Sequence, residues 1–374
     1  MIIATTREDP AVETRVAVTP ETVKRLAGLG ALVRVEAGAG LASGFTDADY
    51  QAAGATIAAS ASQALSGADI VLKVRRPSAA ELAHIQKSAL VIAIMDPYGH
   101  ADALNAMAAA GVSSFAMELM PRITRAQVMD VLSSQANLAG YRAVIDASAE
   151  YGRALPMMMT AAGTVPAARI FIMGAGVAGL QAVATARRLG AVVTATDVRP
   201  AAKEQVESLG AKFIEVAYET DEEKEAAEGV GGYARPMPQS WLDRQKLEVA
   251  KRVAQADIVI STALIPGRPA PVLITEEMVK SMKPGSVIVD LAAANGGNCP
   301  LTEAGKTVVK HGVTIVGETN LPAMVAADAS ALYARNVLDF LKLVIDKEGQ
   351  FHVPMDDDIV AACLMTRAGQ VLRK

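Results

Sequence analysis

The sequence predicts an α/β fold of two domains, each built on a doubly wound parallel sheet, with long helices joining the domains and a cleft between them. Two observations support this prediction. Short apolar runs alternate with Ala-rich helical segments along most of the 374 residues, which is typical of βα units. A chain of this length forms about two domains, and an apolar run leading into a glycine-rich turn near residue 170 begins a second unit.

The first domain is expected to begin with a strand and a capped helix. The helix starts at Pro20 after Thr19, its N-cap, and ends before Gly30, because proline suits the first turn and glycine the C-terminal end. The Gly38-Ala39-Gly40 segment follows a strand but precedes no helical pattern, so we interpret it as a simple turn. Strands are expected at residues 2–5, 31–36, 70–74, 90–95 and 114–116.

A polar stripe follows this domain. A helix is expected to start at Arg125 with Thr124 as its cap. At helical spacing, one face of that helix carries Gln127, Asp130, Ser133 and Asn137. The opposite positions are apolar: Val128, Leu132 and Ala136. The stripe is therefore either the solvated face of a helix that packs on the core or a ligand-binding face, and the pattern leaves both open.

The second domain is organised around a strand, a turn, a helix and a second strand. An apolar strand at 170–173 leads into Gly174, Gly176 and Gly179, which have the G-x-G-x-x-G spacing, and the second strand ends at Asp197. The first glycine permits a tight turn, the second lets a pyrophosphate approach the backbone, and the third lets the helix pack on the strand. The unit predicts a Rossmann-like dinucleotide site with the phosphates at the helix N-terminus.

Asp197 discriminates between the two nicotinamide dinucleotides. Its carboxylate can accept hydrogen bonds from a ribose 2′-hydroxyl and would repel a 2′-phosphate. The acid therefore favours NAD over NADP, although Arg199 keeps NADP conceivable.

The rest of the second domain continues the βα alternation. Further strands are expected at residues 211–216, 257–262, 286–291 and 313–316, and a long helix at 323–344. The three methionines at 157–159 are expected to pack in the core. Residues 219–240 read as a long loop, in which Tyr233 on glycine hinges belongs either to a lid over the cofactor or to an ordinary insertion. The domains are expected to comprise residues 1–128 with 325–374, and residues 129–324.

Composition excludes several classes of function. A net charge of −4 without a basic cluster argues against nucleic-acid binding. Cys299 and Cys363 are far apart and form no metal-binding pattern, so no metal site is expected. No run of about 18 uncharged apolar residues occurs, so no membrane span is expected. The N-terminal residues read as a strand rather than a signal peptide, which predicts a cytoplasmic chain.

With these motifs in view, the chain resembles the alanine dehydrogenase/transhydrogenase family, and in particular the NAD(H)-binding peripheral alpha subunits of proton-translocating NAD(P) transhydrogenases. Beside the glycine fingerprint, the motifs that carry the resemblance lie at residues 14–20, 117–127, 130–142, 157–164, 195–199, 262–267 and 296–300. The likeness covers nearly the whole chain.

The resemblance implies a role for each candidate site residue. Those expected to hold the nicotinamide end and orient it for transfer are Arg122, Gln127, Asp130 and Ser133. Those expected to bind the cofactor elsewhere are Ile123, Thr124, Arg125, Gly174, Ala175, Gly176, Val177, Gly179, Asp197, Val198, Arg199, Gly232, Tyr233, Gln245 and Leu264. Among these, Gly232 and Tyr233 match a mobile loop of the family.

The resemblance also implies partners. The chain would form a homodimer, bind NAD(H), and dock on an NADP(H)-binding beta-subunit domain and on membrane-spanning proton-channel subunits at the cytoplasmic face of the inner membrane. Hydride would pass directly between the two nicotinamides in a Si-specific reaction that is coupled to proton translocation. Such a transfer needs mainly geometry from the protein.

An alanine dehydrogenase is the alternative. Arg15 and Lys73 match the substrate-binding cations of that enzyme, although solvated cations are the simpler reading. The catalytic histidine of the dehydrogenase should fall near Met95, where none stands, and its acid aligns with Ala294. His100 lies five residues away as a misaligned candidate. Because oxidation of an amino acid needs a proton-transfer group, their absence favours the transhydrogenase. A non-enzymatic NAD sensor would differ from both in lacking activity.

Overall fold

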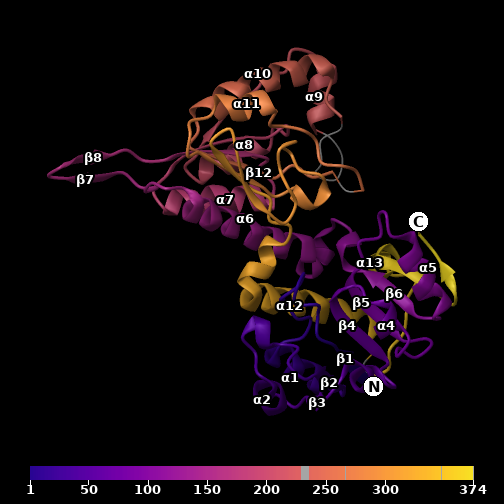
Figure 1. Cartoon of the computed structure of the whole chain (residues 1–374). Helices are drawn as coiled ribbons and strands as arrows, with labels where there is room; N and C mark the ends of the chain where they lie inside the picture. The colour runs from indigo at the N-terminus through magenta and orange to yellow at the C-terminus, as the bar shows by residue number, and fades with distance from the viewer. Residues whose placement is uncertain (229–235, 266, 347, 374) are drawn as a thin grey trace. The chain divides into compact units, whose positions relative to one another are not determined.

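The computed structural model describes residues 1–228, 236–265, 267–346 and 348–373. The chain divides into two compact units, one formed by Met1–Gln135 with Pro322–Lys374 and the other by Ala136–Leu321. Figure 1 labels their elements. No helix among the described residues is long and apolar enough to cross a membrane.

The first unit contains an eight-stranded sheet in the order β17-β16-β6-β5-β4-β1-β2-β3. Its strands are β1 (Ile2–Thr5), β2 (Leu32–Glu36), β3 (Thr56–Ala58), β4 (Ile70–Arg75), β5 (Leu90–Ile94), β6 (Ser113–Ala116), β16 (Leu364–Arg367) and β17 (Gln370–Val371). The strands from β6 to β3 are parallel, whereas β16 and β17 pair antiparallel at one edge. The C-terminal segment therefore completes the first sheet.

Helices cover this sheet, and α12 supplies much of the apolar surface. The helices of the unit are α1 (Pro20–Gly28), α2 (Asp47–Ala52), α3 (Ala61–Leu65), α4 (Ala79–Leu82), α5 (Ala101–Ala109), α12 (Ala326–Val344) and α13 (Asp358–Cys363). Short 3₁₀ segments are η1 (Leu41–Ser43), η2 (Met117–Leu119), η3 (Thr124–Met129) and η5 (Leu321–Val325). On α12, Phe340 packs edge-on against Phe115 of β6 with ring centroids 5.4 Å apart. The long helix thus begins after a 3₁₀ turn, later than the sequence predicts.

The second unit contains a seven-stranded sheet in the order β11-β10-β9-β12-β13-β15-β14. Its strands are β9 (Arg169–Met173), β10 (Val192–Thr196), β11 (Lys212–Phe213), β12 (Ile258–Ser261), β13 (Val287–Asp290), β14 (Thr307–Lys310) and β15 (Val313–Val316). All pairs are parallel except that of β14 with β15. The order reverses on either side of β9, as in a doubly wound nucleotide-binding sheet, so the predicted fold class is confirmed.

The helices of the second unit are α7 (Val177–Arg188), α8 (Ala202–Ser208), α9 (Asp221–Glu228), α10 (Gln239–Gln255) and α11 (Glu276–Ser281), with the 3₁₀ segment η4 (Ala293–Asn295). A further helix, α6 (Val131–Glu150), runs from the first unit into the second. The acidic part of the expected 219–240 loop forms α9, whose buried Glu223 lies 2.7 Å from Arg244 of α10. The prediction of one long loop was therefore wrong for these residues.

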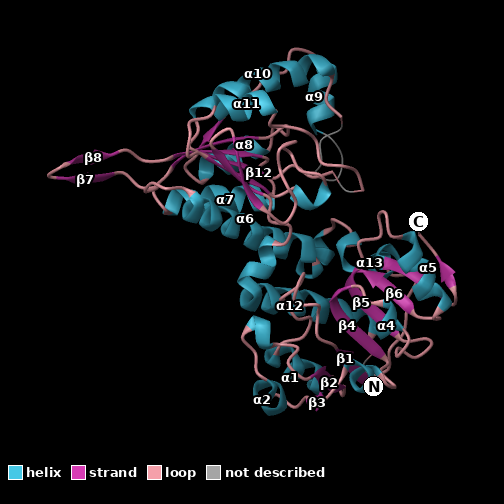
Figure 2. Ribbon diagram, in the orientation of Figure 1, coloured by secondary structure: helices cyan, strands magenta, loops and turns pink. Residues whose placement is uncertain are grey.

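The three methionines at 157–159 do not pack in the core. Met158–Thr160 (β7) and Gly163–Val165 (β8) pair antiparallel in a hairpin of their own, which projects from the second unit in Figure 2. All three methionine side chains are exposed, and Met159 has 76% of its surface exposed. The expected core packing was wrong, because apolar character alone does not distinguish a core segment from an exposed arm.

Candidate functional site

The turn between β9 and α7 is shaped by its glycines. Gly174 has φ +96°, and a Cβ on Gly179 would lie 1.8 Å from the Gly174 carbonyl oxygen. A Cβ on Gly176 would meet nothing within 4 Å. The fold therefore requires the first and third glycines, whereas the second faces open space that a phosphate group could occupy.

The start of α7 is suited to an anion. Gly176 is its N-cap and offers no side-chain hydrogen bond, and Val177, the first helical residue, has an exposed side chain. The first N–H groups of a helix lack intrahelical acceptors and lie at the positive end of its dipole. Gly140 of α6 packs so closely on this helix that a Cβ would lie 2.0 Å from the Ala178 carbonyl oxygen.

Asp197 lies directly beside this turn. Its carboxylate accepts hydrogen bonds from the Ala175 backbone N–H at 2.7 Å and from the Arg199 backbone N–H at 2.9 Å. The Arg199 guanidinium adds two more, from Nε and Nη2, each at 2.9 Å. Burial raises the pKa of Asp197, but the bonds from Arg199 and Ala175 outweigh it, so this pKa lies below its ordinary value. The group is thus an ionised acceptor at neutral pH.

An aromatic pair supports the end of β10, and the sequence analysis did not identify it. The Tyr218 hydroxyl donates to the Val198 carbonyl oxygen at 2.8 Å. The Tyr218 ring stacks on Trp241, with centroids 6.1 Å and planes 9° apart. Tyr218, two residues after the predicted 211–216 strand, was the available signal, but only the fold brings Trp241 of α10 onto it.

The other expected cofactor contacts of this unit lie on α10 and on the loop after β12. Gln245 is half-buried on α10, and Leu264 is exposed in the loop. The fully buried Asn298 holds this loop, because its amide donates to the carbonyl oxygens of Ala263 at 2.9 Å and Pro271 at 2.8 Å. Sequence reasoning missed this role of Asn298. Gly232 and Tyr233 lie outside the described residues.

The polar stripe of the first unit does not lie on one helix. The 3₁₀ segment η3 ends at Asp130, whose ψ of 92° is extended, and α6 begins at Val131. Thr124 is the first residue of η3, and its N-cap is Ile123. Instead, the Asp130 carboxylate accepts from Ser133 N–H at 2.9 Å and from Ser133 Oγ at 2.5 Å. The predicted continuous helix from Arg125 was therefore wrong, because Asp130 starts a new helix.

The apolar positions opposite the stripe are not core positions. Val128 is 58% exposed and Leu132 is 44% exposed, so the interpretation as a helix with a core-packed apolar face was wrong. Arg122, Ile123 and Gln127 also have exposed side chains. The segment is a surface turn with polar groups near the start of α6.

Arg125 is paired with the N-terminus of α13. Its Nη1 lies 2.7 Å from Asp357 Oδ2 and its Nη2 lies 3.0 Å from Asp357 Oδ1, and Asp358 is a further partner. Asp357 also caps α13 by accepting from the Ile359 and Val360 N–H groups. Any contact of Arg125 with a cofactor would have to compete with these ion pairs.

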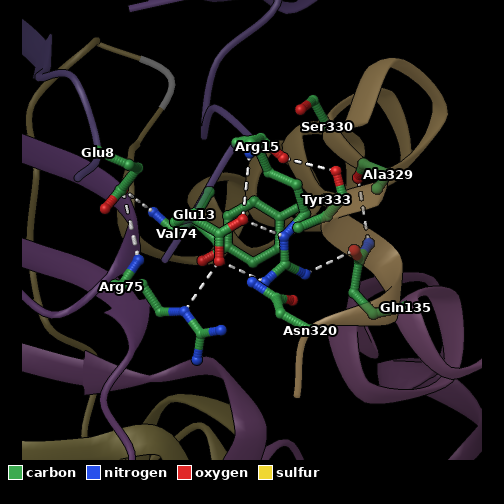
Figure 3. A network of polar contacts seen from close by, with 12 residues as sticks. Glu8, Glu13, Arg15, Val74, Arg75, Gln135, Asn320, Ala329, Ser330 and Tyr333 are labelled. Atoms are coloured by element: carbon green, nitrogen blue, oxygen red, sulfur yellow. Dashed lines mark hydrogen bonds and ion pairs between the residues drawn. The ribbon is translucent and has the colours of Figure 1, made fainter. Parts of the chain in front are cut away.

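Arg15 and Lys73 are buried and internally neutralised. Figure 3 shows that the Arg15 guanidinium donates two hydrogen bonds to the Glu13 carboxylate, with Nε–Oε1 and Nη2–Oε2 distances of 2.7 Å. The remaining Nη1 donates to Gln135 Oε1 at 2.8 Å. Because Arg15 is only 4% exposed, its reading as a solvated cation was wrong.

Lys73, 2% exposed, is held in the same way. Its Nζ lies 2.8 Å from Glu81 Oε1, 2.9 Å from Thr6 Oγ1 and 3.5 Å from Glu8 Oε2. An ammonium group has three donors, and these acceptors match that number. The interpretation of Lys73 as a solvated cation was therefore also wrong.

Position 95 itself carries no histidine, and His100 follows it in the turn after β5. Met95 is fully buried, and its N–H donates to Glu118 Oε2 at 3.1 Å. His100 has an exposed ring whose Nδ1 lies 2.9 Å from the Asp96 carbonyl oxygen. Burial raises the pKa of Glu118, but its carboxylate is occupied by the backbone N–H groups of Met95 and Asp96.

Comparison with known proteins places these features in one family. Residues 4–139 match the model of the alanine dehydrogenase/PNT N-terminal domain, and residues 143–374 match that of the C-terminal domain. The first component of the NAD(P) transhydrogenase alpha subunit of Rhodospirillum rubrum is 56% identical over 378 residues, covering 100% of this chain and 98% of that protein.

Two further comparisons separate the branches of the family. The crystal structure of transhydrogenase from Sinorhizobium meliloti has a TM-score of 0.89 and 56% identity, covering 99% of each chain. Alanine dehydrogenase of Bacillus subtilis is 31% identical over 382 residues, covering 99% of this chain and 92% of that protein. This chain therefore belongs to the alanine dehydrogenase/PNT family of NAD(H)-binding oxidoreductases, in which it matches transhydrogenase alpha subunits more strongly than alanine dehydrogenase.

Proposed function

We propose that this chain is the NAD(H)-binding subunit of a proton-translocating NAD(P) transhydrogenase, in which hydride passes directly between NADH bound here and NADP⁺ bound on a partner domain. The observation that carries the proposal is the glycine turn, where the open position at Gly176 adjoins the ionised Asp197. The turn supplies N–H groups for a pyrophosphate, and the carboxylate suits a ribose rather than a 2′-phosphate.

The nicotinamide end is proposed to bind at the junction of η3 and α6. Arg122, Gln127, Asp130 and Ser133 would hold the carboxamide and orient the ring, as the family resemblance implies. Exposed guanidinium and amide groups, such as those of Arg122 and Gln127, can donate to a carboxamide oxygen. Transfer between two nicotinamides requires orientation of the reacting carbons and no protonation of a substrate.

The internal ion pairs oppose the alternative of an amino-acid dehydrogenase. An enzyme of that kind needs cations for the substrate carboxylate and a proton-transfer group beside the reacting carbon. The guanidinium of Arg15 is already bound by Glu13 and Gln135, and Lys73 is bound by Glu81. At the expected histidine position, Met95 is apolar and buried.

The proposed partners are a second copy of the chain, an NADP(H)-binding beta-subunit domain and membrane-spanning proton-channel subunits. Through these the chain would be peripheral on the cytoplasmic face of the inner membrane. The β7–β8 hairpin supports the homodimer, because an isolated two-stranded hairpin is marginally stable in water and Met157, Met158 and Met159 expose apolar surface. Analytical ultracentrifugation of Met159→Asp should show a shift toward monomer; an unchanged dimer would remove the hairpin from the interface.

Hydride transfer tests the proposal directly. The purified chain is mixed with the NADP-binding domain of a transhydrogenase, NADH and thio-NADP⁺, whose reduced form absorbs at its own wavelength. We expect transfer that depends on both proteins and is strongly reduced in Gln127→Ala. Oxidation of alanine with NAD⁺ by the chain alone would instead establish the dehydrogenase. Binding of NADH with neither reaction would favour a non-enzymatic sensor.

A further inference from the structure

One side chain of α12 contacts both sides of the break at Asp130. Asn336 is buried, and its Nδ2 donates to the Val128 carbonyl oxygen at 2.7 Å. Its Oδ1 accepts from Ser134 Oγ at 2.7 Å. Val128 belongs to η3 and Ser134 to the first turn of α6, so Asn336 connects the two segments that Asp130 separates.

The first turn of α6 has a second attachment to the same helix. Gln135 Nε2 donates to the Ala329 carbonyl oxygen at 3.1 Å and to Ser134 Oγ at 3.2 Å. Gln135 Oε1 accepts from the buried Arg15 guanidinium. Arg15 is in turn bound to Glu13, as Figure 3 shows. A continuous chain of hydrogen bonds thus leads from the buried charges to the turn that carries Gln127 and Asp130.

These bonds matter because they hold a backbone carbonyl group at the C-terminal end of the turn, where Asp130 is bonded only to its neighbour Ser133 among the side chains that the structure describes. The Val128 side chain is exposed, whereas its carbonyl group is held inward by Asn336. Ala126, Met129 and Val131 pack in the core and fix the depth of the turn, but apolar contacts do not set the direction of the neighbouring peptide groups. A buried hydrogen bond has a defined length and angle and does set that direction.

We propose that Asn336 is a positioning residue for hydride transfer, which fixes the relative orientation of Gln127 and Asp130 without touching the cofactor. The inference rests on the proposed function, because it assigns the support of the nicotinamide-binding turn. Its physical basis is the steep dependence of transfer on geometry, in which a displacement of about 1 Å can cost about 100-fold in rate.

The test compares Asn336→Leu and Asn336→Asp with a matched control. Leucine has the same number of side-chain heavy atoms, branched at the same position, and removes both hydrogen bonds, whereas aspartate keeps the acceptor for Ser134 and loses the donor to Val128. Ser330→Ala is the control, because Ser330 is a fully buried polar residue on the same helix that bonds Val16 N–H and Ser43 Oγ, away from the turn. For each variant we would measure the NADH dissociation constant, the single-turnover transfer rate, and the thermal midpoint.

We expect Asn336→Leu to lower the transfer rate by about 10- to 100-fold, with NADH affinity changed by less than about threefold, because most binding contacts lie elsewhere. Asn336→Asp should be intermediate, and Ser330→Ala should keep the wild-type rate even where its thermal midpoint falls. A wild-type rate in Asn336→Leu, or an equal loss in Ser330→Ala, would overturn the positioning role while the proposed function stands. No transfer by the wild-type chain would reject the proposed function and this role with it.

Discussion

Each unit places an arginine two residues after a carboxylate at the end of a strand or loop, and the two pairs differ in burial. Glu13 and Arg15 have side chains 0% and 3% exposed, whereas those of Asp197 and Arg199 are 6% and 29% exposed. Glu13 is also bound by Arg75, a second cation. Asp197 is instead bound by the backbone of the glycine turn. Both side chains of the first pair are buried, whereas Arg199 of the second pair is partly exposed.

The two glycine turns differ in the same way. A Cβ on Gly40 would lie 2.6 Å from the Tyr50 ring, whose hydroxyl donates to the Val18 carbonyl oxygen. Only the three-residue η1 follows that turn, whereas α7 follows Gly176 with twelve residues. The interpretation of Gly38-Ala39-Gly40 as a simple turn is confirmed. The two turns therefore differ in that Tyr50 fills the space beside Gly40, whereas the space beside Gly176 is open.

Replacing the buried carboxylate of Glu13 should lower the free energy of unfolding, and this should be the largest of the expected effects. Glu13→Gln leaves Arg15 and Arg75 without their shared anion, and removing one partner of a buried ion pair costs about 3–5 kcal/mol. We expect a loss of this size in the free energy of unfolding, measured with urea. Glu303→Gln, at exposed ion pairs with Lys306 and Lys310, should change it by less than about 1 kcal/mol. A cost below about 1 kcal/mol for Glu13→Gln would show that the first pair is no more structural than a surface pair.

The contribution of Glu13 to the free energy of unfolding should decrease gradually as the pH is lowered. Burial opposes ionisation of Glu13, but hydrogen bonds and charge from Arg15 and Arg75 lower its pKa from an ordinary 4.5 to about 2. A group with a lowered pKa stabilises the fold above its unfolded value, and this contribution is lost as the pH falls toward the folded value.

The measurement is the difference in unfolding free energy between the wild type and Glu13→Gln. We expect it to shrink by at least about half between about pH 6 and pH 3. Glu8, whose pKa is raised by burial, titrates in both proteins, so its opposite contribution largely cancels from the difference. A difference that is independent of pH would contradict the lowered pKa of Glu13.

The paired substitutions Gly40→Ala and Gly176→Ala should separate stability from binding. Gly40→Ala forces a methyl group into the Tyr50 ring and should cost about 1–3 kcal/mol of stability, with NADH affinity unchanged. Gly176→Ala has room for its methyl group in the protein and should weaken NADH binding by about tenfold or more, because the methyl group obstructs the pyrophosphate. Thermal unfolding and NADH fluorescence titration measure the two effects. Weaker NADH binding by Gly40→Ala, together with lower stability and unchanged binding in Gly176→Ala, would contradict the assignment of a structural role to Gly40 and a binding role to Gly176.

Asp197→Asn should give the smallest but most specific change. Losing the charged acceptor should weaken NADH binding by about 1–2 kcal/mol, or roughly 5- to 30-fold. The variant also removes a carboxylate charge that pairs with Arg199 and would repel a 2′-phosphate, so NADPH should bind more tightly than to the wild type, and Asp197→Asn with Arg199→Ala should lose part of that gain. Unchanged NADH affinity would refute the ribose assignment.

The local patterns of the sequence determined the two-sheet α/β fold, the glycine turn and Asp197 beside it. These features depend on spacing within about 30 residues, because one βα unit contains the strand, the turn and the helix that define them. The three glycines and the acid could therefore be identified before any contact was known.

Only the tertiary structure determined which partners the polar stripe, the cations Arg15 and Lys73, and Arg125 have. Asn336 reaches Val128 from 208 residues away, and Arg125 meets Asp357 across 232 residues. Arg15 became a core residue because Gln135, 120 residues distant, completes its hydrogen bonds. A sequence pattern specifies which groups can bond, but burial and partner depend on segments that only folding brings together, since a charged side chain is stable inside the protein only where its partners already lie.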